Sequence, residues 1–130
     1  RYFMINVKMS DILNASEILT KISGYKVSGK YAFAIARLVR EVEKEMQTFE
    51  SIRMELIRKY ADKDEDGELV VNEGNVHLSE ENILLCNAEL AESLGQNVEL
   101  NANPLKYDWF DEIEITAGEA AALEPFMEIE

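Results

Sequence analysis

The sequence predicts a helix-dominated α+β fold in a single domain over residues 1–130. Three observations lead to this prediction. A stretch without glycine or proline runs over about residues 30–61 with apolar residues at helical spacing, and short alternating segments elsewhere are bounded by turn residues. The 130 residues are 47% hydrophobic and include five Phe, five Tyr and one Trp, which is enough for one core.

The first two elements are a short strand and a helix. Within residues 2–9 the letters I-N-V-K-M alternate apolar and polar, which is typical of a half-buried strand. Ser10 is a favourable N-cap for a helix through about Ile22, and the Ser-Gly pair at 23–24 ends that helix.

The stretch over about residues 30–61 predicts one long amphipathic helix. Its apolar residues recur every seven positions, at Ile35, Val42, Phe49 and Leu56. An unbroken helix of this length would be about 48 Å long, more than the diameter of a domain of this size. We expect its apolar stripe to pack on other helices of its own chain, and a coiled-coil homodimer is the alternative.

The region after the long helix predicts a hairpin and another helix. The segments E-L-V-V and V-H-L flank N-E-G-N, which indicates a hairpin with its turn at Glu73-Gly74. Ser79 is then an N-cap for a helix that ends before Gly95 and has acidic residues in its first turn.

The last third of the chain predicts a strand, two extended pieces and a short helix. The pattern N-V-E-L-N is typical of a strand, and K-Y-D-W-F and E-I-E-I read as extended pieces. Thr116 and Glu119 form a capping box for a helix that the following proline stops. We expect residues 68–78 and 97–115 to form one small antiparallel sheet, joined by the N-terminal strand.

The charge is distributed unequally along the chain. Residues 1–63 hold 12 Lys and Arg against 8 Asp and Glu, a net of +4, whereas residues 64–130 hold only Lys106 against 18 Asp and Glu, a net of −17. An acidic surface of this kind repels phosphate backbones, so we expect no direct nucleic-acid binding. It favours a protein partner with a basic surface; the alternative is that the acidic residues serve only solubility.

Composition also bears on the compartment. No apolar run approaches the roughly 20 residues of a membrane-spanning helix, and no segment has the pattern of a secretory signal. The single cysteine, Cys86, excludes an internal disulfide. We therefore expect a cytoplasmic protein without membrane attachment.

Residues that could support catalysis are scarce. His77 is the only histidine, and nothing in the pattern pairs it with Cys86, which follows two leucines on an amphipathic helix and reads as a packed apolar residue. The chain has neither of the glycine-rich patterns that bind phosphate. The prediction is a protein that is not an enzyme and has no cofactor, with calcium as the exception considered next.

The segment D-K-D-E-D-G-E-L-V-V-N-E matches the twelve-residue loop of an EF-hand. Calcium binds oxygen, and this spacing would place several oxygens around the turn at Gly67. The candidate ligands are Asp62, Asp64, Asp66, the carbonyl of Glu68 and Glu73. However, Gly74 and the cap at Ser79 replace the exiting helix that an EF-hand requires, so a purely structural acidic turn is the alternative.

The order of these parts resembles that of a known group of proteins. The long helix ending in L-I-R-K-Y-A-D-K-D-E-D-G-E, the helix S-E-E-N-I-L-L-C-N-A-E-L and the ending I-T-A-G-E-A-A-A-L-E-P-F are similar to a family of small bacteriophage and prophage proteins of unknown function. The resemblance implies a phage origin, life in the cytoplasm of a bacterial host and a structural role for the acidic turn. It implies no particular activity and no functional residues.

The favoured function is non-enzymatic binding of a host or phage protein, with an anti-defence inhibitor of a basic nucleic-acid-binding protein as its most specific form. Aromatic residues among carboxylates suit a partner surface that is basic and partly apolar. The candidate partner-binding residues are Tyr107, Asp108, Trp109, Phe110, Asp111 and Glu112. For Trp109 and Phe110 the alternative is that they close the core.

Two other functions remain open on the sequence. The long helix and self-association would suit a phage assembly or structural accessory protein. The acidic loop would suit a calcium-binding module.

Overall fold

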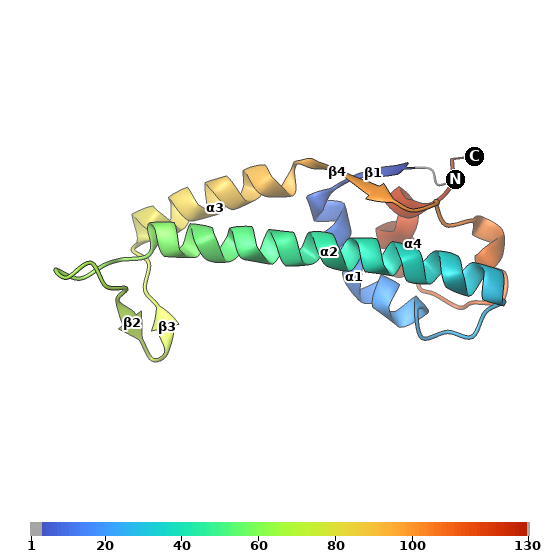
Figure 1. Cartoon of the computed structure of the whole chain (residues 1–130), viewed down its shortest axis with the longest axis horizontal. Helices are drawn as coiled ribbons and strands as arrows, with labels where there is room; N and C mark the ends of the chain where they lie inside the picture. Colours follow the sequence, from blue (N-terminus) through green and yellow to red (C-terminus); the bar gives the residue numbers. More distant parts are fainter. Residues whose placement is uncertain (1–3, 130) are drawn as a thin grey trace. The chain divides into compact units, whose positions relative to one another are not determined.

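A computed structural model describes residues 4–129 and confirms a helix-dominated α+β fold (Figure 1). The chain forms two compact units. One contains the chain up to Met46 and again from Gln96 onward, and the other contains Gln47–Gly95. The boundary between the two charge halves, at residues 63 and 64, falls inside the second unit, so the charge halves do not coincide with the two compact units.

In the first unit, the N-terminal strand pairs with the strand predicted near residue 100. Strand β1 (Met4–Lys8) is antiparallel to β4 (Asn97–Asn101), with Ile5 opposite Leu100. Ile5 and Val7 are buried while their neighbours in β1 are exposed, as the alternating pattern predicts.

Helix α1 (Met9–Ile22) follows β1 directly, and the expected cap at Ser10 is wrong. The N-cap is Lys8, so the helix begins two residues earlier than expected. The carboxylate of Asp11, the third residue of the helix, accepts a hydrogen bond from the Lys8 backbone N–H (2.9 Å), as the acidic residue of a capping box does. The side chains of α1 that face the core are Met9, Ile12, Ala15, Ile18, Leu19 and Ile22.

Helix α4 (Ala117–Leu123) packs against α1 and has the predicted capping box. The Thr116 N–H donates to Glu119 Oε1 (2.9 Å), and the Glu119 N–H donates to Thr116 Oγ1 (3.0 Å). Glu119 also forms an ion pair with Lys21 of α1 (3.0 Å). Beyond Leu123 the chain continues as the short 3₁₀ helix η2 (Glu124–Phe126), and Phe126 is fully buried.

Helix α2 (Gly29–Tyr60) is the predicted long helix, with each end displaced by one residue. Its first part contributes Ile35, Leu38 and Val42 to the core of the first unit. Within residues 4–129, neither α2 nor any other helix combines the length and the apolar character needed to cross a membrane.

The second unit contains the predicted hairpin and helix. Strands β2 (Val71–Asn72) and β3 (Asn75–Val76) pair antiparallel, and both turn residues have positive φ, 51° at Glu73 and 82° at Gly74. Helix α3 (Glu80–Leu94) begins after Ser79, whose hydroxyl accepts from the Asn82 N–H (3.3 Å). The turn and the cap are confirmed.

The single sheet expected from residues 68–78 and 97–115 is wrong. Over the described chain, β2 pairs with β3, and β4 pairs with β1 in a separate sheet. The physical reason is that the hairpin pairs its two strands with each other, while the buried Leu100 of β4 finds its partner in β1.

Substitutions in β1 test whether the β1–β4 pair holds the first unit together. Replacing buried Ile5 by alanine should destabilise the protein by about 2–5 kcal/mol because a cavity remains in the core. Met4→Ala on the exposed face of the same strand should change stability by less than about 0.5 kcal/mol. Urea unfolding of both variants measures the difference, and equal effects would contradict a core role for the pair.

Candidate protein-binding site

The acidic and aromatic segment that the sequence singled out forms a 3₁₀ helix, η1 (Tyr107–Phe110), so the expected extended piece is wrong. The Trp109 N–H donates to the Lys106 carbonyl (3.1 Å), and the Asp111 N–H donates to the Asp108 carbonyl (3.3 Å). Glu128 holds the start of the turn, since its Oε2 accepts from the Tyr107 N–H (3.0 Å). The polar and aromatic residues of K-Y-D-W-F thus form a tight turn, and one of them, Trp109, is buried.

Trp109 is the inward residue of this turn. Its side chain is 7% exposed and stacks on the ring of Tyr31, with 5.0 Å between ring centroids. Its indole Nε1 is buried without a hydrogen-bond partner in the described chain. Trp109 thus lies in the core, which is the alternative that the sequence left open for it.

The other five residues of the segment lie at or near the surface. Tyr107 is 42% exposed, Phe110 is half-buried, and the three acidic side chains are exposed; these are Asp108, Asp111 and Glu112. The segment therefore exposes three carboxylates and the ring of Tyr107, while Trp109 is buried.

Tyr107 and Phe110 border an apolar pocket that the sequence did not predict. Its volume is about 130 Å³. The remaining lining residues come from the segment before α4, from α4 itself and from the chain after it: Ile115, Ala120, Leu123, Glu124 and Met127. Glu124 adds a fourth exposed carboxylate to those of Asp108, Asp111 and Glu112. The capping box at Thr116 predicted α4, but not which segment its apolar residues would face.

Two further contacts fix this region. The Leu105 N–H donates to the Phe126 carbonyl (2.8 Å), and the Glu128 N–H donates to the Leu105 carbonyl (2.8 Å). These bonds tie Leu105, two residues before η1, to the end of η2 and to the chain directly after it. The Thr116 N–H bond holds the pKa of Glu119 below its usual range, and the ion pair with Lys21 acts in the same direction. The pocket is therefore built on bonded elements rather than on a free loop.

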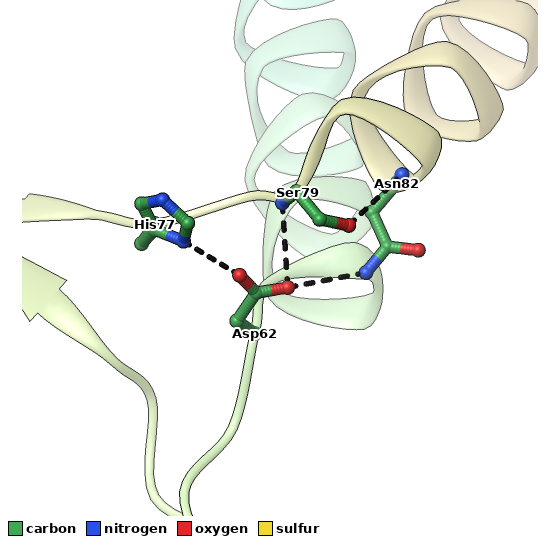
Figure 2. A network of polar contacts seen from close by, with 4 residues as sticks. All are labelled: Asp62, His77, Ser79 and Asn82. Atoms are coloured by element: carbon green, nitrogen blue, oxygen red, sulfur yellow. Dashed lines mark hydrogen bonds and ion pairs between the residues drawn. The ribbon is translucent and has the colours of Figure 1, made fainter.

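In the acidic turn of the second unit, the carboxylates of Asp62 and Asp64 accept hydrogen bonds from N–H groups of the chain. Figure 2 shows Asp62 at the centre of a network that joins the end of α2 to the start of α3. Its Oδ1 accepts from the Ser79 N–H and from Asn82 Nδ2, both at 3.3 Å, and its Oδ2 lies 2.5 Å from Nδ1 of His77. The contact with His77, assisted by the Ser79 bond, lowers the pKa of Asp62.

Asp64, two residues further along the chain, also accepts hydrogen bonds from backbone N–H groups. Its Oδ1 accepts from the backbone N–H groups of Asp66 (2.9 Å) and Glu68 (3.0 Å), which closes the turn that contains Gly67. Glu73 lies in the hairpin turn at positive φ. Within residues 4–129 the structure contains no group of three or more acidic, His or Cys side chains placed to share a metal ion. The geometry thus gives the calcium hypothesis no support.

The Asp62 network can be tested by removing one charge. Asp62→Asn should lower the unfolding temperature and speed amide exchange at Ser79 and Asn82 near neutral pH, because the joint between α2 and α3 is weakened. Glu65→Gln is the control, since it removes the same charge from an exposed residue of the same turn. Equal effects of both variants would contradict a joint at Asp62.

The pH dependence of that difference follows from the direction of the pKa shift. Because the folded-state pKa of Asp62 is lowered, its contribution to stability is fully present above the usual range of aspartate and is lost as the pH falls through the lowered pKa. The gap in unfolding temperature between Asp62→Asn and the unchanged protein should therefore shrink below about pH 4.

The calcium hypothesis has its own test. A ligand that binds only the folded state raises the unfolding temperature, so we expect equal unfolding temperatures in millimolar calcium and in excess chelator. Differential scanning fluorimetry measures this. A rise in calcium alone would show that the carboxylates assemble around the ion.

Compared with known proteins, the sequence matches no family model, no curated protein and no solved structure. Function is therefore inferred from the residues of the site itself.

Proposed function

We propose that the protein acts without catalysis by binding a protein partner that has a basic surface. The observation that carries this proposal is the apolar pocket beside η1, which has Glu124 in its lining. The exposed carboxylates of Asp108, Asp111 and Glu112 lie within or directly after η1, the turn that contributes Tyr107 and Phe110 to the pocket. An apolar pocket bordered by charged groups is the arrangement in which one inserted side chain supplies much of the binding energy of an interface.

The size of the pocket indicates what it binds. At about 130 Å³ it is smaller than the roughly 300–1,000 Å³ typical of pockets for drug-sized ligands. It suits a single side chain. Arginine and lysine combine an apolar stem with a charged head, so their stems fit the pocket while their heads reach the carboxylates.

The charge of the chain supports the same class of partner. Its net charge of −13 steers basic proteins toward it and speeds their association at low salt. An inhibitor that takes the nucleic-acid-binding surface of a host defence protein is the most specific form of this proposal. The resemblance to phage proteins and the expected bacterial cytoplasm are consistent with that form and belong to the same proposal.

Capture from bacterial lysate at low and high salt, with identification by mass spectrometry, tests the proposal. The triple reversal Asp108→Lys, Asp111→Lys and Glu112→Lys should abolish capture of the specific partner. The matched control reverses the same number of exposed acids in the turn of the second unit, with Glu65→Lys, Asp66→Lys and Glu68→Lys. The control should retain most of the binding, because site contacts and not total charge decide affinity.

A second variant tests the pocket without changing any charge. Ala120 is an exposed residue of α4 that lines the pocket, so Ala120→Phe should fill it. We expect a loss of affinity of at least about tenfold at an unchanged unfolding temperature. Equal losses in both charge-reversed variants, together with full binding by Ala120→Phe, would contradict the site.

A further inference from the structure

The second unit buries few apolar side chains. In residues 4–129 the structure buries twenty apolar residues, and only three of them lie in the second unit: Phe49, Ala61 and Cys86. The end of α2 and helix α3 lie side by side in this unit (Figure 1), joined by the ion pair of Lys59 with Glu89 (3.0 Å) and by the hydrogen bond from the Tyr60 hydroxyl to Glu89. Exposed ion pairs contribute little stability. With three buried apolar residues, the second unit has only a small core of its own.

The same unit exposes much of its apolar surface. Of the ten large hydrophobic side chains exposed in residues 4–129, six belong to this unit, and they are Ile52, Met54, Val71, Ile83, Leu84 and Leu85. Leu84 is the extreme case within the unit, with 71% of its surface accessible. An exposed apolar patch on a folded protein marks an interaction surface.

Two of these six residues, Leu84 and Leu85, belong to a face of α3 that points away from its buried side. Cys86 is buried, which marks the inner face. Leu84, Ala88 and Ala91 are exposed and follow one another at intervals of four and three residues, on the side roughly opposite Cys86 at 3.6 residues per turn. We name this stripe, together with the adjacent Leu85, the outer face of α3.

Charge identifies the chemistry of the partner. Helix α3 carries four glutamates, Glu80, Glu81, Glu89 and Glu92, and no basic residue. Glu81 and Glu92 flank the outer face at helical spacing and are exposed. Two copies of α3 packed through their outer faces would bring these glutamates together, which is unfavourable. A helix with lysines or arginines beside its apolar stripe would pair with them.

We propose that the outer face of α3 binds a basic amphipathic helix of a partner protein. The bound helix would cover Leu84 and Leu85 with its apolar stripe and place its basic residues against Glu81 and Glu92. This surface belongs to the second unit and is separate from the pocket beside η1. The proposal is therefore independent of the function proposed above.

Synthetic peptides provide the test. The probe is a fluorescent peptide of about 18 residues with a leucine stripe flanked by lysines, and the comparison peptide has glutamate at every lysine position. Fluorescence anisotropy at about 0.15 M salt limits non-specific attraction to the acidic protein. We expect the lysine peptide to bind and the glutamate peptide to bind at least about tenfold more weakly.

Two matched variants locate the binding surface. Leu84→Ser with Leu85→Ser removes two exposed side chains from the outer face and should weaken binding of the lysine peptide by at least about tenfold. Phe33→Ser with Val71→Ser removes two exposed apolar side chains elsewhere and should leave binding unchanged. The triple reversal at Asp108, Asp111 and Glu112 should retain at least half of the affinity, which separates this surface from the pocket beside η1.

Three results would overturn the proposal. The first is equal binding of both peptides, and the second is full binding by the variant with serines at 84 and 85. The third is a doubled mass of the unchanged protein in analytical ultracentrifugation that the same two serines abolish, because the occupant of the outer face would then be a second copy of the chain. Far-ultraviolet circular dichroism of each variant confirms that the helices are retained.

Discussion

The pairing of β1 with β4 is the constraint on which the first unit depends. It joins residues 4–8 to residues 97–101, and closing so long a loop costs conformational entropy that local contacts cannot offset. Burial of Ile5, Val7 and Leu100 on one side of the pair offsets this cost. The pair also fixes the chain on either side of it, since α1 begins directly after β1 and η1 follows β4 within a few residues. The candidate pocket therefore has its position because the two strands meet.

Local patterns predicted the helices well, because their causes are local. The long helix α2 follows from a stretch without glycine or proline that carries apolar residues at helical spacing, and α3 and α4 begin at the predicted caps, Ser79 and Thr116. The sheet partners and η1 could not be predicted in this way. Trp109 turns inward because Tyr31, far away in the sequence, stacks on it, and no spacing within K-Y-D-W-F contains that information.

The candidate sites also differ in whether their features depend on local sequence or on contacts between distant segments. The carboxylates around Asp108 were found from the sequence because exposed charge is a property of composition, whereas the pocket needs Leu123 and Met127 to meet Phe110 from another segment. The acidic turn shows how one spacing allows two interpretations. A carboxylate oxygen can accept from a backbone N–H as readily as it can bind calcium, and spacing alone does not distinguish the two. Asp62 and Asp64 direct their oxygens to N–H groups at the start of α3 and within the turn.

The two proposed surfaces use the same chemistry in different units. Each combines carboxylates with apolar side chains, so we propose for each a basic and partly apolar partner, and we expect both to repel nucleic acid. Because both are on one chain, a partner held at one surface is present at a raised effective concentration for the other. A basic protein with both a helix and a separate arginine or lysine could use the two together. Loss of either surface would then reduce its affinity by more than that surface's own contacts explain, whereas two unrelated partners would respond independently.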